Sequence, residues 1–464
     1  MIFVLIVLLF VSFFLVIEQY SWKGAILFTL LAGFIQDPLR KLSGIDSSYY
    51  AAISLIFFIL TFLILKSKFK SWDLELICWP NPIVITLLPA FFYLLILQSL
   101  NSIARFNDVR LTIVGLLFYI LPLISLWVGY KVACDLVFLR KMLILYVILC
   151  SLTALSVLIS IFGFESSLLK EVGTGIEITG TGQGFSGLWR TSEIAGWHLA
   201  AGASFSFILG MSEPKGIKQI LYFFITFGLA FLTITTGRRK SLGLIIIFLS
   251  FYFLYYSLTG KSNRFTKVLG SIACVVVVSL SSYGLIFNSD IQANLEPFFD
   301  RSSTLTIEES QNRLSVQGLG AIVRGLEIAG PFGFGVGVGS NTGTTDIGTG
   351  RAGIQSLSYV SEGGGGRLIV ELGGIGIAFF SVFLLQIFVL YIKIFSLVRY
   401  IINQSVDIIT GLAIFTLANV VTFLSASQLY SDPFVLIMLG LCSGAVLAIP
   451  KIYLDYQAAF SNKL

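Results

Sequence analysis

The stretch GPFGFGVGVG, residues 330–339, lies inside a long polar segment, Asp290–Ser361, that has hydrophobic segments on both sides. Ten hydrophobic segments precede this polar segment and three follow it. It contains the acidic pair Glu308 and Glu309 and several arginines, among them Arg313. A chain that only built a membrane scaffold would have little use for so many polar residues in one loop. We therefore expect this loop to be the working part of the protein and the hydrophobic segments to hold it in place.

The composition is that of a membrane protein. Mean hydropathy is +0.93 and 56% of the residues are hydrophobic, against about 45–50% in an ordinary globular chain. Apolar runs of about eighteen residues or more recur along the chain, and each is long enough to cross the hydrocarbon layer of a bilayer. The net charge of +6 is modest, and no nucleic-acid partner is expected.

The sequence predicts an all-α polytopic membrane protein with twelve or thirteen transmembrane helices in a single domain, residues 1–464. A large extracytoplasmic loop, 288–362, separates the tenth and eleventh hydrophobic segments, and a smaller one is expected at 164–192. Segment 24–36 is short, so whether it crosses the membrane or re-enters it stays open. The expected spans are 2–17, 24–36, 50–65, 82–100, 111–130, 142–163, 193–211, 219–235, 242–259, 268–287, 366–392, 406–425 and 432–449.

Basic residues in the short loops set the orientation, because cytoplasmic loops are enriched in lysine and arginine. Lys66, Lys68 and Lys70 mark one cytoplasmic loop, and alternate segments then fall outside. The outer side holds three lysines but eleven arginines. A guanidinium stays charged and offers a planar fork of donors that fits phosphate and carboxylate, so this asymmetry predicts an anionic ligand. The outer arginines are Arg40, Arg105, Arg110, Arg190, Arg238, Arg239, Arg301, Arg313, Arg324, Arg351 and Arg367.

Two polar groups lie near span boundaries before the large loop. Arg238, Arg239 and Lys240 follow one another between two spans, and they could grip a lipid diphosphate or simply anchor the helix. Arg190 precedes the sole histidine, His198. Arg190 could pair with Glu193 at a helix start. A lone intramembrane histidine is either a packing residue or a functional one.

Two further groups lie in and after the large loop. An amphipathic stretch from Arg313 to Arg324 runs into the glycines of residues 330–339, whose backbone N–H groups could cradle an anion or only form turns. After four consecutive glycines, Arg367 and Glu371 occupy positions i and i+4 at the start of a span. At that spacing they can neutralise each other.

Together these pieces resemble the O-antigen ligase and Wzy-type O-antigen polymerase superfamily over residues 190–385. Gly237-Arg238 resembles the family's Ser/Gly-Arg element at the end of a span. Arg313 followed by Pro331–Gly335 resembles the arginine-led helix and Pro-x-x-Gly-x-Gly of its large loop. Glu371–Gly376 resembles the Glu-x-Gly-x-x-Gly pattern of the next span.

The resemblance implies glycosyl transfer from an undecaprenyl-diphosphate-linked oligosaccharide to an acceptor glycan, without metal or cofactor, at the outer face of the bacterial cytoplasmic (inner) membrane. Many ligases carry a histidine before the final helix, where this chain has Gly364–Gly366, so a polymerase or a divergent branch of the superfamily fits better than a ligase. The expected catalytic residues are Arg313, Arg238 and the candidate base Glu362. The expected binding residues are Arg190, Arg239, Arg324, Arg367, Glu371 and His198.

Two other functions stay open, namely a transporter or flippase of polysaccharide precursors and a scaffold in an export assembly. A transporter would need buried ionisable groups near the bilayer midplane and broken helices. The expected partners are membrane lipids and the two glycans, and a chain-length regulator is left open. Convergence of Arg238, Arg313 and Arg190 on one lipid-accessible site would favour the transferase.

Overall fold

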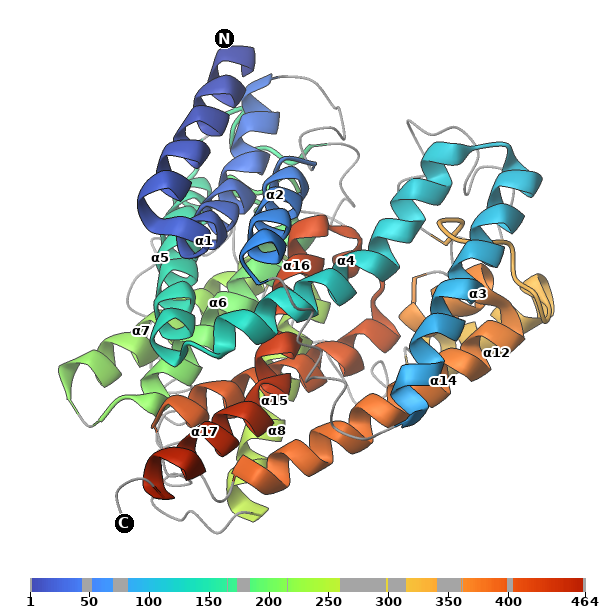
Figure 1. Cartoon of the computed structure of the whole chain (residues 1–464). Helices are drawn as coiled ribbons and strands as arrows, with labels where there is room; N and C mark the ends of the chain where they lie inside the picture. The colour runs from blue at the N-terminus through green and yellow to red at the C-terminus, as the bar shows by residue number, and fades with distance from the viewer. Residues whose placement is uncertain are drawn as a thin grey trace. The chain divides into compact units, whose positions relative to one another are not determined.

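The computed structural model describes residues 2–43, 52–69, 82–164, 166–172, 184–214, 216–258, 298, 314–339, 360, 362–398 and 404–461. Within these ranges the regular elements are helices, and no strand occurs (Figure 1). The all-α prediction is confirmed for this part of the chain. The expected span at 268–287 and most of the expected loop at 288–362 lie outside it.

Eight helices among the described residues are long and apolar enough to cross a membrane. The protein is therefore a multi-pass membrane protein, as its hydropathy predicts. The total of twelve or thirteen spans stays a prediction. The eight helices are Val109–Ala133, Leu136–Ile161, Ser192–Ser212, Ile217–Thr235, Arg239–Leu258, Gly364–Ile394, Asp407–Ser425 and Pro433–Asp455.

The chain forms two compact units, which are described separately. Unit 1 consists of Met1–Lys68, Asp135–Leu305 and Asn403–Ala418. Unit 2 consists of Phe69–Cys134, Thr306–Ile402 and Asn419–Leu464. Each unit is assembled from several stretches of sequence, so the chain is not divided into two consecutive domains. The single membrane domain that the sequence predicts therefore stays a prediction.

In unit 1 the first helix, α1 (Ile2–Ser43), folds back on itself. The ring centroids of Phe13 and Phe28 are 5.3 Å apart, whereas fifteen residues of straight helix would span about 22 Å. Phe57 of α2 (Ala52–Lys68) packs on both rings, at 4.9 and 5.1 Å. Expected spans 2–17 and 24–36 are therefore the two arms of one helical hairpin, closed by an aromatic core.

The second arm of α1 runs alongside α5 (Leu136–Ile161). Trp22 contacts Phe138 near the start of α5, and twelve residues later Phe34 contacts Tyr146, with ring centroids 5.4 and 5.2 Å apart. At about 1.5 Å per residue, the arm from Trp22 to Ser43 is about as long as a bilayer is thick. Asp37, Arg40 and Lys41 occupy the last part of this arm, however, and its apolar part, segment 24–36, is shorter than the roughly 20 apolar residues of an ordinary span, so whether it crosses or re-enters the membrane stays open.

Helices α5 to α8 of unit 1 are joined so that two connections meet at one end. At that end the segment before α6 contacts both the last part of α5 and the end of α7. Leu188 N donates to Ser156 Oγ of α5 at 2.9 Å, and Phe185 N donates to Thr235 O, at the turn between α7 and α8, at 3.4 Å. The opposite end holds the ion pair between Arg140 and Glu213. The two segments predicted on the outer side thus share one end of the unit. Helices α6, α7 and α8 span Ser192–Ser212, Ile217–Thr235 and Arg239–Leu258.

Helix α6 is the central helix of unit 1, and its apolar window is wholly buried. Small residues allow this packing. A Cβ on Gly202 would lie 2.6 Å from the Cys150 sulfur of α5, and a Cβ on Gly196 would lie 2.6 Å from the Ser241 hydroxyl of α8. On another side, Trp197 contacts Phe415 of α15 (Gln404–Ser425), with ring centroids 6.2 Å apart.

Unit 2 is built around the close packing of α4 against α16. A Cβ on Gly444 of α16 would lie 1.9 Å from the Leu126 carbonyl oxygen, and one on Gly129 of α4 would lie 2.2 Å from the Leu441 carbonyl oxygen. Gly440 and Gly444 form the Gly-x-x-x-Gly spacing that lets membrane helices approach closely. The helices of unit 2 are α3 (Pro82–Phe106), α4 (Val109–Ala133), α12 (Gly320–Ala329), α14 (Gly364–Val398), α16 (Pro433–Leu447) and α17 (Ile449–Ser461).

Helix α14 is broken at Gly373, whose φ and ψ of 73° and −179° are open to glycine but costly for other residues. The break removes hydrogen bonds within the helix, and the glycine-rich segment (Gly330–Gly339) replaces them. Phe334 N donates to Val370 O at 2.8 Å and Gly335 N to Glu371 O at 3.1 Å. In the other direction, the N–H groups of residues 374 and 375 donate to the carbonyls of residues 330 and 331, at 3.2 and 3.1 Å. A break in an apolar helix is tolerated when other groups satisfy the freed backbone in this way.

The glycine-rich segment also packs on α3 and α4. Val336 N donates to the Gln98 carbonyl of α3 at 3.2 Å, and Gln98 Nε2 donates back to Phe332 O at 2.8 Å. A Cβ on Gly337 would lie 2.2 Å from the Leu111 carbonyl oxygen of α4. The glycines therefore serve close packing, and the bonded N–H groups named above are not free to cradle an anion. The interpretation of this run as turns and packing fits better.

Candidate functional site

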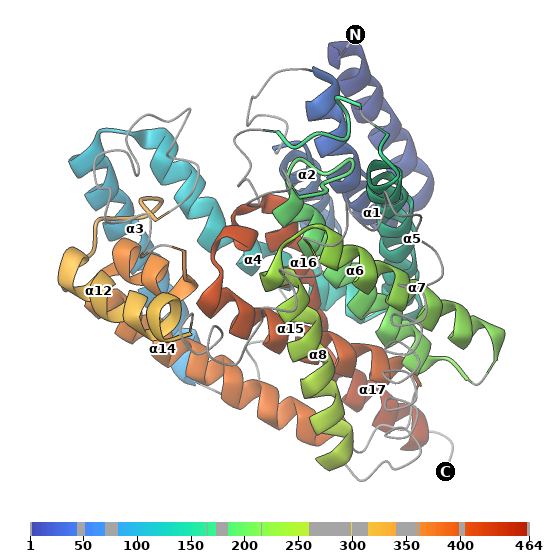
Figure 2. The ribbon, with the colours of Figure 1, turned by 180° about the vertical axis from the view of Figure 1, so that it is seen from behind.

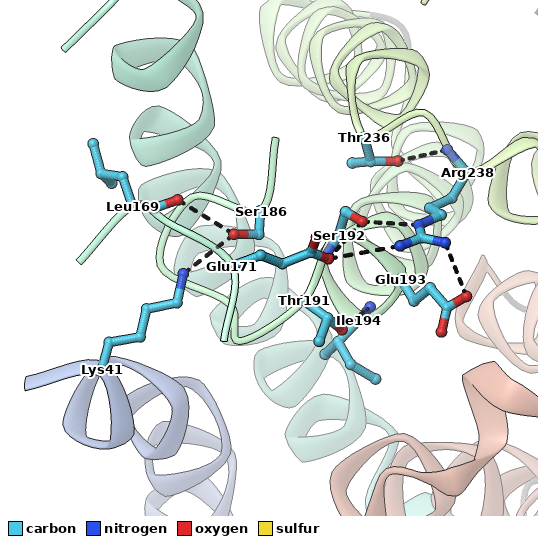
Figure 3. A network of polar contacts seen from close by, with 10 residues as sticks. All are labelled: Lys41, Leu169, Glu171, Ser186, Thr191, Ser192, Glu193, Ile194, Thr236 and Arg238. Atoms are coloured by element: carbon cyan, nitrogen blue, oxygen red, sulfur yellow. Dashed lines mark hydrogen bonds and ion pairs between the residues drawn. The ribbon is translucent and has the colours of Figure 1, made fainter. Parts of the chain in front are cut away.

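The best-defined polar site of unit 1 is a group that we call the Arg238 cluster, consisting of Glu171, Ser192, Glu193 and Arg238 (Figure 3). Helix α7 ends at Thr235, and Gly237 turns the chain with a φ of 67°. Arg238 stands at this turn, directly before α8. Ser192 and Glu193 form the first turn of α6. The cluster thus lies where a connection and two helix starts meet.

The guanidinium of Arg238 is held from several sides. Its Nε donates to Ser192 Oγ at 2.8 Å and its Nη1 to Glu193 Oε1 at 3.2 Å. Its Nη2 lies 3.7 Å from Glu171 Oε1. The Arg238 side chain is 14% exposed, so it is fixed in position yet not sealed off. A planar cation with a fixed orientation suits recognition of phosphate or carboxylate.

Ser192 links the arginine to Glu171. Its hydroxyl accepts from Arg238 and donates to Glu171 Oε1 at 2.7 Å, and its backbone N–H donates to the same oxygen at 2.5 Å. The Glu171 side chain is 1% exposed, and its Oε2 has no hydrogen-bond partner among the described residues. A buried carboxylate loses its hydration and needs hydrogen bonds or a cation in place of water. Ser192 and Arg238 supply these to one of its two oxygens.

Lys41 and Asp37, near the end of α1, extend the network. Lys41 Nζ donates to Gly187 O at 2.6 Å and Ser186 Oγ at 3.2 Å, and Arg190 N donates to Asp37 Oδ2 at 3.1 Å. Lys41 lies beyond the apolar stretch of its arm. Burial lowers its pKa from 10.5 to about 8, although Asp37 and Glu171 oppose that shift.

The segments that meet around the Arg238 cluster carry more positive than negative charge. Residues 36–43, 166–172, 184–193 and 236–241 contain seven cationic and three acidic side chains. The acidic side chains are Asp37, Glu171 and Glu193, and the cationic ones are Arg40, Lys41, Lys170, Arg190, Arg238, Arg239 and Lys240. This end of unit 1 therefore favours an anionic ligand.

Of the other predicted residues of unit 1, His198 lies in an aromatic environment. It is 2% exposed, and its Nδ1 is 2.7 Å from the Tyr146 hydroxyl. The Trp189 ring stacks on it at 6.0 Å, and Phe34 and Trp197 also contact it. These contacts favour the packing interpretation of this histidine. Arg190 and Arg239 are both half-buried, the second at the start of α8.

The polar site of unit 2, which we call the Arg367 cluster, consists of Tyr119, Arg367, Glu371 and Ser431. Arg367 Nε donates to Glu371 Oε1 at 3.1 Å, and the Tyr119 hydroxyl donates to Glu371 Oε2 at 2.7 Å. Arg367 Nη1 reaches Ser431 Oγ at 3.3 Å. The i, i+4 pairing of Arg367 with Glu371 is confirmed.

The Arg367 cluster is closed to solvent. The side chains of Arg367 and Glu371 are 2% and 0% exposed, and the guanidinium lies 3.9 Å above the Phe118 ring. Both carboxylate oxygens have partners, as a buried ion pair requires. Because Glu371 also accepts from Gly335 through its carbonyl, the cluster positions the break in α14 instead of presenting free donors to a ligand.

The remaining predicted residues of unit 2 differ in their surroundings. Arg324 is exposed on α12. Glu362 is half-buried, and its carbonyl accepts from Ser427 N at 2.7 Å. Arg313 lies outside the described residues, so its convergence with Arg238 and Arg190 stays a prediction. Three of the four consecutive glycines, Gly364–Gly366, form the start of α14, where a Cβ on Gly366 would lie 2.0 Å from the Val360 carbonyl oxygen.

Several functional candidates were missed by sequence reasoning, namely Lys41, Glu171, Ser192 and Tyr119. Each makes its key contact with a residue far away in the chain, and none belongs to a recognisable motif. In the described ranges, no three His, Cys, Asp or Glu side chains are grouped so that they could hold a metal ion. No family model matches this chain, and no curated protein sequence matches it.

Proposed function

We propose that the protein is a membrane glycosyltransferase that moves a glycan from undecaprenyl diphosphate to an acceptor glycan at the outer face of the bacterial cytoplasmic membrane. An acceptor hydroxyl oxygen attacks the anomeric carbon of the donor sugar. The bond from that carbon to the diphosphate oxygen breaks, and its electron pair leaves with the diphosphate. The hydroxyl proton passes to a general base.

The observation that supports this proposal is the arrangement of the Arg238 cluster. Arg238 is held by Ser192 and two carboxylates, so little reorganisation is needed when charge develops on a leaving group. Cations fixed in advance near that charge stabilise the transition state more than the ground state. The surplus of cations around the cluster compensates its carboxylates and leaves net attraction for a diphosphate.

A polymerase-type reaction, which extends a growing glycan, is favoured over a ligase-type transfer to another acceptor. Many of the ligases that the chain resembles carry a histidine just before the final helix, whereas the sole histidine here, His198, is buried among aromatic rings. Gly364–Gly366 stand where those ligases carry the histidine, and Glu362, the base expected from the sequence, lies two residues before α14. The ligase-type reaction remains the alternative form of the same chemistry.

The test is the glycan profile of cells that carry Arg238→Ala or Arg238→Lys, with the amount of protein in the membrane kept equal. We expect single lipid-linked repeat units to accumulate and long glycan to disappear in the alanine variant. The lysine variant keeps the charge but loses the planar fork, so it should restore little activity. Arg110→Ala, an exposed arginine of unit 2, serves as the matched control and should leave the profile unchanged. A normal profile in the Arg238→Ala variant would contradict the proposal.

One observation favours transport as a second candidate function. Helix α14 is broken at Gly373 and carries the buried charges Arg367 and Glu371, and transporters place broken helices and buried charges at their substrate sites. The two functions differ in where the precursor accumulates. Loss of a flippase leaves lipid-linked repeat units on the cytoplasmic face, whereas loss of a polymerase leaves them on the outer face. The closed hydrogen bonding of the Arg367 cluster makes the transferase the stronger proposal.

A further inference from the structure

The two carboxylates beside the Arg238 guanidinium are held with unequal strength. Glu171 Oε1 accepts from the hydroxyl and the N–H of Ser192, and it lies 3.7 Å from Arg238 Nη2. Glu193 makes a single polar contact with the described residues, a hydrogen bond of 3.2 Å from Arg238 Nη1 to its Oε1. The two carboxylates thus reach different nitrogens of the guanidinium (Figure 3). Glu193 is the more weakly held of the two.

Glu193 can leave the guanidinium at little cost, whereas Glu171 cannot. The Glu193 side chain is 23% exposed and that of Glu171 is 1% exposed, so only Glu193 can exchange Arg238 for water. A partly exposed ion pair of this kind contributes little to stability. Glu193 also lies in the first turn of α6, where a negative charge stays favourable beside the positive end of the helix dipole.

The guanidinium has donors left for a ligand. It carries five N–H groups, and two of them donate to described residues, one from Nε to Ser192 and one from Nη1 to Glu193. An anion with several oxygens can bind Nη1 and Nη2 together, in the bidentate geometry that arginine forms with phosphate. A phosphate on Nη1 would lie beside Glu193 Oε1, and two anions at such a distance repel each other. Phosphate and Glu193 therefore compete for Nη1.

The start of α8 adds positive charge beside Arg238. Arg238 directly precedes α8, and Ser241 N donates to its carbonyl at 3.0 Å. The starts of α6 and α8 lie side by side, because a Cβ on Gly196 would lie 2.6 Å from Ser241 Oγ; both helices can be followed from behind in Figure 2. The Glu171 carboxylate already caps the start of α6 through Ser192 N. A phosphate that displaces Glu193 thus gains the guanidinium and the partial charge of the α8 start.

We infer that Glu193 is an intramolecular competitor for the anion site of the Arg238 cluster, which occupies Nη1 until a phosphate group of the ligand displaces it. This competition lowers the affinity for every anion by the same factor. Weakly bound carboxylates, such as those of acidic sugars, are thereby kept off the cluster, and release of a diphosphate product is favoured. The inference rests on the proposed function for the identity of the ligand, a lipid-linked diphosphate, and not for the reaction.

Binding of inorganic pyrophosphate tests the competition in the purified full-length protein. Its dissociation constant follows from the rise of the unfolding midpoint with pyrophosphate concentration, in detergent, without divalent cations and at constant ionic strength. Glu193→Gln removes the charge in a side chain of the same size. Glu193→Asp keeps the charge but shortens the side chain by one methylene group, which draws the carboxylate away from Nη1. Asp455→Asn, at an exposed position of α17 in unit 2, is the control for loss of a negative charge elsewhere.

We expect Glu193→Gln and Glu193→Asp each to bind pyrophosphate at least about threefold more tightly than the wild type, the factor that loss of a partly exposed ion pair supplies. Asp455→Asn should bind as the wild type does. Arg238→Ala should bind at least about tenfold more weakly, because it loses the charged hydrogen bonds to the anion.

Binding that is unchanged or weaker in Glu193→Gln would overturn the inference. Tighter binding in Glu193→Gln with wild-type binding in Glu193→Asp, or an equal gain in Asp455→Asn, would reduce the role of Glu193 to a general effect of charge and would also overturn it. Undiminished binding in Arg238→Ala would place the anion elsewhere, with the same consequence. Glycosyl transfer is measured separately, so the expected pyrophosphate pattern in a protein that releases no undecaprenyl diphosphate would contradict the proposed function alone.

Discussion

At the residue scale, Glu171 is the side chain on which the Arg238 cluster depends. It is 1% exposed and accepts three contacts on one oxygen, from the Ser192 hydroxyl and N–H and from Arg238. Removing it leaves these donors buried without their acceptor. We expect Glu171→Ala to destabilise the protein by about 1–3 kcal/mol, the usual cost of an unsatisfied buried donor.

Glu193→Ala is the matched control for this prediction, because Glu193 contacts the same guanidinium but is 23% exposed. Partly exposed ion pairs contribute only about 0–1 kcal/mol. The measurement is the thermal unfolding midpoint in detergent, with Arg238→Ala as a further comparison. An unfolding midpoint lowered equally by both glutamate substitutions would show that burial of Glu171 has no special role.

Lys41 predicts a pH dependence of stability. Its pKa is about 8 in the folded protein and 10.5 for a free lysine, so the folded state binds fewer protons than the unfolded state between these values. Stability should therefore rise with pH from about 8 to 10.5. Below pH 8 the burial penalty is present in full, because the ammonium is charged in both states.

The measurement is the difference in unfolding midpoint between the wild type and Lys41→Met, which has no proton to release at this position. This difference should shift in favour of the wild type as pH rises through the window. A difference that stays constant from pH 7 to 10.5 would show that Lys41 is not held at a lowered pKa.

The sequence identified only part of the two clusters. Arg238 was found because three cations at a span boundary stand out, and the Arg367–Glu371 pair was found because i, i+4 neighbours meet on a helix. Glu171 and Tyr119 carry no such signal. Glu171 bonds with Ser192, 21 residues away on α6, and pairs with Arg238 beyond α7. Tyr119 bonds with Glu371, 252 residues away. Only the folded chain brings these residues together.

At the element scale, the break in α14 and the glycine-rich segment depend on each other. Gly373 has a φ of 73°, and a Cβ at this position would lie 2.4 Å from Gly333 N. We expect Gly373→Ala to destabilise the protein by about 2 kcal/mol or more, because it adds backbone strain and pushes the segment away. Gly333→Ala should have a similar effect, since its φ is 70° and a Cβ would lie 2.6 Å from Gly373 N.

Gly243→Ala in α8 is the control, because nothing lies within 4 Å of a Cβ at that position. Alanine is favoured over glycine inside a helix by about 1 kcal/mol, so this variant should be as stable as the wild type or more stable. Unfolding midpoints in detergent compare the three variants. Equal unfolding midpoints for Gly373→Ala and Gly243→Ala would contradict the mutual dependence of the break in α14 and the glycine-rich segment.

The same two elements were only half predictable. The sequence placed glycines at Pro331–Gly335 and Glu371–Gly376 as two separate motifs, and neither motif indicates its partner. Hydrogen bonds from Phe334 and Gly335 to the broken turn join them in the structure. Which two segments pair in this way depends on the path of the chain in space. The spacing of apolar residues along the sequence does not predict that path.

At the scale of the whole molecule, hydropathy predicted most of what the described helices confirm. Apolar runs of sufficient length mark the eight candidate spans. Because lysine-rich loops alternate with the other connections along the chain, the sequence predicted that residues 164–192 and the Thr235–Ser241 turn lie on the same side of the membrane. In the structure the described parts of these two segments meet at one end of unit 1. Hydropathy did not predict that residues 320–339 follow the apolar helix α14, because their many glycines give the stretch a polar appearance.

The proposed glycosyltransferase breaks the bond between a glycan and undecaprenyl diphosphate. The most direct measurement uses purified protein in lipid vesicles with undecaprenyl-diphosphate-linked repeat units, and it follows release of undecaprenyl diphosphate together with growth of the glycan. We predict one released diphosphate for each new glycosidic bond, with both lost in Arg238→Ala and retained in Arg110→Ala. Movement of intact lipid-linked repeat units across the bilayer, with no diphosphate released by the wild type, would contradict the claim and identify a transporter.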